Sequence, residues 1–308
     1  MRAMSMKCKI RCRLCCSLLC LALPLSSSCA LATQSNEFAR GREAGIIQSD
    51  LIREASGIVA SRQSPGVLWV HNDSGDEPRV FAINDKGEFL GTCHIKDATA
   101  RDWEDIAVGP GPDPDQQCLY IGEIGDNNAT YPHVTVYRVP EPKIDPASPF
   151  KPMQICPADA IRLTYPGGPR DAETLLVDPL TRDIYIVSKR DLFSKVYRAV
   201  YPQSTTKTTR MERVASLPWG FAVAGDVSPD GSRVIIRSVF GASMWNRPVG
   251  KPLWRAFSGK QIRLATISER QGESICFDAQ GTGYFTIGEK AHPPLHYFGP
   301  AERNASRP

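Results

Sequence analysis

A short sequence pattern recurs five times along this chain and constrains its fold more than any other feature. Each copy has an acidic residue, then one or two small or polar residues, and then an apolar stretch with strand character. Successive acids stand 50, 69, 53 and 47 residues apart. Repeats of this length indicate a β-propeller, in which every repeat forms one small sheet of a ring. The acids that open the five copies are Glu54, Glu104, Glu173, Asp226 and Glu273.

The predicted strands divide the chain into five blades. The fifth blade stops one strand short, and the stretch 44–52 is a spare strand ahead of the first blade. Because an open propeller would expose sheet edges, we expect this N-terminal strand to complete the last blade. A sixth blade would have to lie within residues 140–170, where a Pro-rich stretch looks like an insertion. We therefore predict an all-β propeller of five blades over residues 43–300, with a flexible lead-in at 33–42 and a flexible tail at 301–308.

The first 32 residues are typical of a signal peptide. Five basic residues precede an apolar run from Leu14 to Leu25, and Ala30-Leu31-Ala32 supplies a small-x-small cleavage site. The run is shorter than the roughly 20 residues that cross a bilayer, so we predict no transmembrane segment. Secretion or a periplasmic location follows. Lipid attachment at Cys29 is the weaker alternative, because Ser26 stands where a lipoprotein signal usually carries Leu.

Removing this segment changes the charge and the cysteine count. The segment holds five of the 37 Lys and Arg residues and none of the 33 Asp and Glu residues, which leaves 32 bases against 33 acids. A charge this close to neutral argues against a nucleic-acid-binding surface. The four remaining cysteines can form two disulfides by any of three pairings, or stay free and buried. They are Cys93, Cys118, Cys156 and Cys276, of which Cys276 best fits a free thiol in an apolar strand.

Propeller topology predicts which loops carry function. The loop that enters the innermost strand of a blade and the loop that leaves the second strand lie on the same face, and these loops hold most of the acids. The turns on the opposite face have ordinary Gly, Pro, Ser and Asp turn chemistry. Since function usually sits in loops on a rigid scaffold, we predict a site for a small-molecule or glycan ligand at one mouth of the central channel.

The repeat acids should converge at that mouth, where several carboxylates cannot all stay ionised without a partner. A hard divalent cation, most of all Ca²⁺, would neutralise them, since it binds carboxylate, amide and carbonyl oxygens. Protonated or Arg-paired acids that act in acid–base catalysis are the second interpretation, and acids that only hold loops are the third. The predicted metal ligands are Glu54, Asn72, Glu104, Asp126, Asn127, Glu173, Asp226 and Glu273, and the predicted catalytic residues are His71, Asp73 and Glu104.

Two tryptophans, Trp103 and Trp219, adjoin the same loops. Such residues stack on a sugar ring in some proteins and pack in the core more often. The serines at the same strand ends lack a Gly-x-Ser-x-Gly setting, which argues against a serine hydrolase. These are Ser56, Ser188 and Ser274.

Four motifs resemble those of a group of exported bacterial propeller proteins, over about residues 50–290. They are Glu54-Ala-Ser-Gly-Ile58, Trp69-Val-His-Asn-Asp-Ser-Gly-Asp76, Asp102-Trp-Glu-Asp-Ile-Ala107 and Gly122-Glu-Ile-Gly-Asp-Asn127. More distantly, an acid at the start of each inner strand is similar to gluconolactonase/paraoxonase-type and esterase-like-phytase propellers. Those six-bladed families hold Ca²⁺ or another divalent ion in the central channel, and the resemblance implies matching roles for Glu54, Asn72 and Asp226.

These features together favour a metal-dependent hydrolase of an ester, lactone or phosphoester. The ion would polarise the substrate oxygen, and a carboxylate or His71 would move the proton. A binding or scaffold propeller without chemistry is the first alternative. A glycosidase that uses two channel carboxylates is the second.

Overall fold

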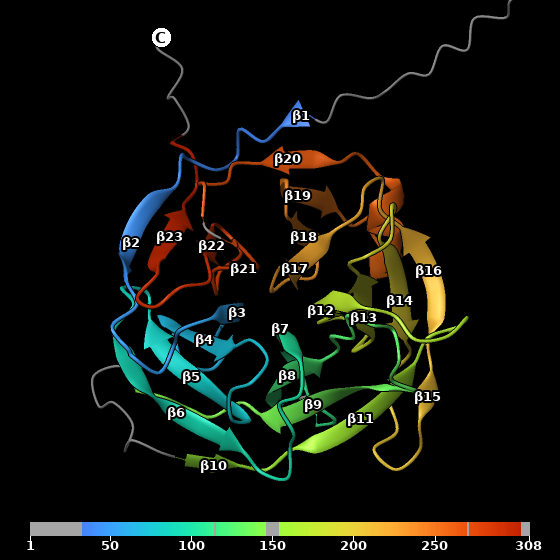
Figure 1. Cartoon of the computed structure of the whole chain (residues 1–308). Coiled ribbons are helices and arrows are strands. Elements are labelled where there is room, and N and C mark those ends of the chain that lie inside the picture. The colour runs from blue at the N-terminus through green and yellow to red at the C-terminus, as the bar shows by residue number, and fades with distance from the viewer. Residues whose placement is uncertain (1–32, 114, 146–153, 270, 303–308) are drawn as a thin grey trace, which may run out of the picture. The chain divides into compact units, whose positions relative to one another are not determined.

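The computed structural model describes residues 33–302, apart from residues 114, 146–153 and 270. The predicted signal peptide with Cys29, and all but the first two residues of the predicted tail at 301–308, lie outside the described residues. The described chain forms five small sheets arranged in a ring, which is a five-bladed β-propeller (Figure 1). The predicted fold class and blade number are therefore confirmed.

Four antiparallel strands run outward from the ring axis in every blade (Figure 1). From inside to outside they are β3 (Ala55–Ala60), β4 (Val67–Asn72), β5 (Arg79–Asn84) and β6 (Phe89–Ile95) in blade 1; β7 (Trp103–Pro110), β8 (Gln117–Glu123), β9 (Val134–Pro140) and β11 (Asp159–Thr164) in blade 2; β12 (Ala172–Val177), β13 (Ile184–Ser188), β14 (Lys195–Ala199) and β16 (Glu212–Ser216) in blade 3; β17 (Ala222–Val227), β18 (Arg233–Ser238), β19 (Gly241–Asn246) and β20 (Ile262–Leu264) in blade 4; and β21 (Ser274–Phe277), β22 (Tyr284–Ile287), β23 (Pro294–Phe298) and β2 (Arg42–Ile46) in blade 5. Every residue of β3, β12, β17 and β21 is buried. These inner strands are mostly apolar and are buried on both faces because each lies between two neighbouring blades.

The N-terminal strand closes the ring, as the sequence predicts. β2 pairs antiparallel with β23, with Arg42 opposite Tyr297 and Ile46 opposite Pro294. The strand occupies residues 42–46, at the start of the predicted stretch 44–52. The first and last parts of the described chain therefore share one sheet, and the propeller has no gap between its first and last blades.

A segment of the following blade covers the outer edge of four blades. β10 (Gln154–Cys156) pairs in parallel with β6 of blade 1, β15 (Thr209–Arg210) with β11 of blade 2, and β1 (Thr33–Gln34) with β20 of blade 4. The 3-10 helix η1 (Leu253–Ser258) packs against β16 of blade 3. Each of these four segments precedes the outer strand of its own blade in sequence and contacts the outer strand of the preceding blade. We call the four segments edge clasps. Covered edges offer no unpaired N–H or C=O groups to other chains.

Part of the predicted lead-in at residues 33–42 pairs with strands of the ring. Besides the pairing of β1, Phe38 forms a bridge with Pro300. These pairings satisfy backbone groups at an outer sheet edge, and the polar composition of the segment does not reveal them. η1 is the only helix in the described part of the chain, where no helix is long and apolar enough to cross a membrane.

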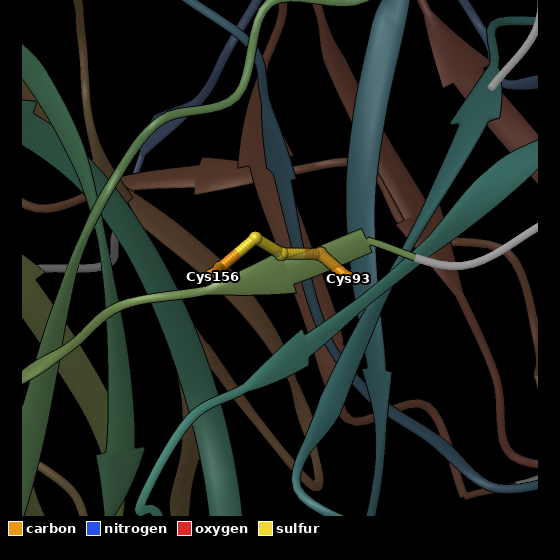
Figure 2. Close-up of a disulfide and its surroundings, with 2 residues drawn as sticks. All are labelled: Cys93 and Cys156. Carbon is orange, nitrogen blue, oxygen red and sulfur yellow. A yellow bond between two sulfur atoms is a disulfide. The ribbon is translucent and has the colours of Figure 1, made fainter. Parts of the chain in front are cut away.

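A disulfide joins the clasp β10 to blade 1 (Figure 2). Cys93 on β6 and Cys156 on β10 are bonded, with their Cα atoms 6.0 Å apart and a sequence separation of 63. Cys118 and Cys276 are free and buried. The Pro-rich stretch that looks like an insertion thus supplies a covalent link between blades 1 and 2, and one disulfide forms where the spacing allowed two.

Replacing both Cys93 and Cys156 with serine should lower the free energy of unfolding by about 2–4 kcal/mol, because the disulfide closes a long loop. Urea unfolding monitored by tryptophan fluorescence measures the loss. Dithiothreitol should lower the urea midpoint of the wild type to about that of the double variant, and should leave the midpoint of the double variant unchanged. A reductant-induced shift in the double variant would show that another disulfide holds the fold.

Candidate functional site

A β-bulge near the start of the inner strand sets the direction of one side chain in each of blades 1 to 4. The pairing register shifts at Glu104 in β7 and at Glu173 in β12, and at Ser56 and Val223 in the inner strands of blades 1 and 4. Glu273 lies directly before the first paired residue of β21, which is the corresponding place in blade 5. A bulge redirects the side chain at its extra residue. Three of the five repeat acids therefore occupy equivalent positions.

The other two repeat acids, Glu54 and Asp226, are not equivalent to these three. Glu54 is exposed and precedes β3. Asp226 lies inside β17, three residues beyond the bulge, and its carboxylate accepts hydrogen bonds from the N–H groups of Val227 (2.8 Å) and Phe277 (2.9 Å). Burial raises the pKa of Asp226 to about 6, and Arg62 at 4.0 Å opposes the rise. Asp226 thus joins blade 4 to blade 5.

Five carboxylates meet where blades 1, 2 and 3 adjoin, and we call them the acid cluster. One group consists of Asp73, Asp102 and Glu104 and a second of Glu104, Asp171 and Glu173, with one ligand atom per residue and all within 4.8 Å of one another in each group. Asp73 follows β4, whereas Asp102 and Asp171 precede inner strands. Glu104 belongs to both groups and lies at the centre of the cluster.

Burial and mutual repulsion perturb the acid cluster strongly. Burial, followed by the charges of Glu173, Asp73 and Asp102, raises the pKa of Glu104 well above its usual value. Burial raises the pKa of Glu173 to about 8 although Lys189 opposes it, and burial with neighbouring acids raises the pKa of Asp102 to about 6. The Lys189 ammonium bonds Glu173 Oε1 and lies 3.8 Å from Glu273. One lysine therefore faces several carboxylates.

Several oxygens of the acid cluster have no hydrogen-bond donor within the described residues. Glu173 Oε2 is buried and unpartnered, and the carboxylates of Asp102 and Glu104 accept no hydrogen bond there. Both of these carboxylates lie over Gly125, where any Cβ would overlap them. Asp171 differs, because it accepts from the Asp126 N–H (3.0 Å) and from Arg190 (2.6 Å). The unpartnered oxygens are those that remain free to bind a ligand.

The hydrogen-bonding groups of the Asn72 side chain are all occupied by residues of its own loop and its neighbours. Its amide oxygen accepts from the N–H groups of Arg53 (3.0 Å) and Glu54 (3.3 Å). Its amide nitrogen donates to the Leu51 carbonyl and to Asp76, both at 2.7 Å. An amide has two donors and an acceptor with two lone pairs, so Asn72 has no capacity left for a metal ion.

Asp126 and Asn127 stabilise the loop after β8. The Asp126 carboxylate accepts from the N–H groups of Thr130 (2.9 Å) and Tyr131 (2.8 Å). Asn127 is exposed, and its side-chain oxygen accepts from Arg190. Asp126 is not a member of either carboxylate group that forms the acid cluster.

His71 is enclosed in the protein interior. Its side chain is fully buried, its ring lies edge-on to Trp103 with centroids 5.8 Å apart, and Nδ1 lies 2.8 Å from the Asn72 carbonyl. Burial lowers the pKa of His71, so the ring is neutral and Nδ1–H donates to that carbonyl. Trp103 is buried as well and donates to the Thr99 carbonyl at 2.8 Å, which is a packing role.

Asp105 is the structural acid that the sequence pattern did not single out. Its buried carboxylate accepts from the N–H groups of Ile106 and Leu175, each at 2.9 Å, and of Gly225 at 3.2 Å. These three residues belong to blades 2, 3 and 4. Burial raises the pKa of Asp105, and the three donors oppose the rise. Its position directly after Glu104 is the only signal in the sequence.

A pocket of about 430 Å³ opens beside Asp73. Asp73, Glu54, Asn72 and Asp76 are among its lining residues. A second carboxyl pair lies near it, since burial and a hydrogen bond with Glu273 raise the pKa of Glu289 to about 8, with Asp73 and Glu54 adding to the rise. Of the acid cluster, Asp73 is the member that lines this pocket.

Comparison with known proteins finds similarity to solved structures only. No family model matches the sequence, and no curated protein matches it. Among solved structures, the chain is similar to the Pan2 WD40 domain of Neurospora crassa, with a TM-score of 0.44 and 10% identity over 89% of this chain and 98% of that chain. It is also similar to a luciferin-regenerating enzyme, with a TM-score of 0.44 and 8% identity over 80% and 92% of the two chains. The family resemblance inferred from the motifs stays a prediction.

The neighbouring acids Glu104 and Asp105 should respond oppositely to neutralisation. Asp105→Asn converts one of the two carboxylate oxygens that accept backbone N–H groups into an NH2 donor. The free energy of unfolding should fall by about 1–3 kcal/mol for each buried N–H group left unsatisfied. Glu104→Gln removes a buried, unpartnered charge and should leave the stability of chelator-treated protein unchanged or higher. Urea unfolding at mildly alkaline pH measures both. Equal losses in the two variants would assign Glu104 to the scaffold.

Chelator-treated protein should lose stability as the pH rises from about 4 to about 8. The raised pKa values of Asp102 and Glu173 mean that the folded state binds more protons than the unfolded state in this window. Glu173 determines most of the loss in the free energy of unfolding, which is on the order of a few kcal/mol at about 1.4 kcal/mol per pKa unit. Asp102 contributes less, because it is half-exposed and solvent screens its charge. Glu173→Gln should flatten the profile measured by urea unfolding. A wild-type profile that rises through this window would contradict the assignment.

Proposed function

We propose that the acid cluster binds one hard divalent cation, Ca²⁺ in the first place, and that the bound ion serves hydrolysis of an ester, lactone or phosphoester. The observation that carries the proposal is the buried, unpartnered Oε2 of Glu173 beside Glu104, whose own oxygens accept no hydrogen bond in the described part of the chain. Such oxygens are unfavourable unless a cation or a proton reaches them.

The donor set fits a hard cation. Asp73, Asp102, Glu104 and Glu173 offer only carboxylate oxygens, which suit Ca²⁺, Mg²⁺ or Mn²⁺ better than the softer metals that prefer His and Cys. Ca²⁺ tolerates irregular geometry and many oxygen ligands, whereas Mg²⁺ demands a near-ideal octahedron. Carboxylates that come from three blades favour the more tolerant ion. Asp171 contributes charge, since its oxygens are already bonded.

The surrounding groups supply what a hydrolase requires besides an ion. A divalent cation polarises a substrate oxygen and lowers the pKa of a bound water. The Glu273–Glu289 pair, with the pKa of Glu289 raised to about 8, holds a proton near neutral pH at the edge of the cluster. We assign proton transfer to this pair in place of His71, because His71 is enclosed. The pocket beside Asp73 provides room for a small substrate.

We also infer that the protein works outside the cytoplasm. The Cys93–Cys156 disulfide supports this location, because disulfides persist in oxidising compartments. The signal-peptide composition of residues 1–32 agrees with it.

A propeller without chemistry is the second candidate. The ion pair between Lys189 and Glu173, together with protonated carboxyls, offers a way to neutralise the cluster without a metal. Asp105 and Asp226 show that acids of inner strands also serve the scaffold in this chain. Metal binding separates the two candidates.

Titrating Ca²⁺ into chelator-treated protein should show one site by calorimetry and raise the melting temperature, because the ion binds only the folded state. The Glu104→Gln/Glu173→Gln double variant should bind at least about tenfold more weakly, which is about 1.4 kcal/mol. Glu54→Gln is the matched control, since Glu54 is exposed and outside the acid cluster, and should leave the affinity unchanged. Absence of both heat and a thermal shift in the wild type would refute the metal site.

Hydrolysis is tested with chromogenic esters, lactones, phosphoesters and glycosides, each with Ca²⁺ and with chelator. Turnover of an ester, lactone or phosphoester that requires the ion supports the hydrolase. Ion binding without any turnover supports the binding propeller, and chelator-resistant cleavage of a glycoside supports the glycosidase.

A further inference from the structure

A groove of about 320 Å³ lies on blade 4, beside the connection between β16 and β17. Ser243 and Arg263 are directly opposite each other on β19 and β20, so their side chains share one face of the blade. Aromatic and polar side chains both line the groove, and we call these two sets its aromatic wall and its polar wall. Its main side chains are Trp219 and Phe240 on the first, and Ser243, Gln261, Arg263 and Thr266 on the second.

The two rings of the aromatic wall differ in exposure and in their packing partners. Phe240 is 81% exposed and occupies, with Val239, the two turn positions between β18 and β19. Tight hairpin turns favour Asn, Asp and Gly, so a bare phenyl ring there is not explained by the turn itself. Trp219 is half-buried and packs against Trp245, with ring centroids 6.0 Å apart. One wall of the groove therefore presents two aromatic rings.

Phe221 supports Phe240 at a cost in backbone strain. Its φ is 63°, in the left-handed region that bulky residues rarely adopt. Its N–H donates to the Lys189 carbonyl at 2.9 Å, and its carbonyl accepts from the Val239 N–H at 3.2 Å. The Phe221 ring meets the Phe240 ring edge-on, with centroids 5.9 Å apart. The strained residue thus holds the exposed ring in place.

The polar wall has unused hydrogen-bonding capacity. Within the described residues, the exposed Arg263 guanidinium makes no ion pair and no hydrogen bond. The Gln261 amide nitrogen donates to the Ser243 hydroxyl oxygen at 2.7 Å, which leaves the Gln261 oxygen and the Ser243 hydroxyl hydrogen free. The Arg263 guanidinium offers planar N–H donors, and the Gln261 oxygen offers a free acceptor. This combination matches two adjacent hydroxyl groups of a ligand, because each hydroxyl both donates and accepts a hydrogen bond.

We propose that this groove binds a pyranose unit of a glycan. The C–H face of the sugar lies against Phe240 and Trp219, and its hydroxyls bond Arg263 and Gln261. An apolar chain would leave the polar wall unpaired, and an inorganic anion would leave the aromatic wall bare. The volume lies within the range of small-ligand pockets and admits a mono- or disaccharide. The site is separate from the acid cluster and needs no metal ion.

The test uses chelator-treated full-length protein, so that it is independent of the acid cluster. Four disaccharides are the probes: cellobiose, maltose, N,N′-diacetylchitobiose and digalacturonate. Saturation-transfer NMR and tryptophan fluorescence should show binding of at least one at millimolar concentration. Phe240→Ala and Arg263→Ala should each weaken that binding about tenfold. Phe193→Ala is the matched control, because Phe193 is 54% exposed and does not line the groove.

Phe221→Gly separates ligand binding from folding. Glycine relieves the left-handed strain, so the melting temperature should change little, while the probe binds several-fold more weakly because Phe240 loses its support. The proposal is overturned if none of the four probes binds the wild type. It is also overturned if Phe240→Ala and Arg263→Ala keep their fold and bind the probe as the wild type does.

Discussion

The ring depends on buried carboxylates that accept backbone N–H groups across blade boundaries. Asp105 accepts from blades 2, 3 and 4, and Asp226 from blades 4 and 5. Inner strands near the axis leave N–H groups without strand partners at the blade junctions, and charged acceptors bond such groups more strongly than neutral ones. The edge clasps hold the ring at its circumference in a different way, by strand pairing and one disulfide. Both sets of contacts stabilise the ring from which the loops at the channel mouth extend.

The acids of this protein fall into two kinds, according to whether backbone N–H groups donate hydrogen bonds to their carboxylates. Asp105 and Asp226 have backbone donors and belong to the scaffold, whereas Glu104 and Asp102 have none in the described chain and repel one another. The β-bulge at Glu104 makes this division possible, because it sends two adjacent acids to different surroundings. The proposed ion site consists of the carboxylates that the scaffold leaves unpaired.

The fold was predictable because its signals can be counted along the sequence: the repeat spacing, the apolar strands and the spare strand that completes the last blade. The grouping of acids on one face followed from propeller topology. The individual roles did not, because they depend on distant contacts. Asp226 matches the repeat pattern in sequence but lies three residues beyond the bulge, and Asn72 looks like a ligand until its four partners are known. The clasp at residues 33–34 and the choice of Cys156 as the partner of Cys93 likewise arise from pairing between blades.

The closure of blade 5 by β2 links the order of synthesis to the order of folding. β2 is made before every blade, yet its partner β23 ends at Phe298, so β2 waits unpaired until almost the whole described chain has been synthesised. Contacts of this sequence separation form late because the loop must first be closed at an entropic cost. Blades 1 to 4 have their inner strands in chain order and can assemble as they emerge. The closed ring, and with it the meeting of blade 5 with blade 1 at the mouth, can form only after β23 has been synthesised.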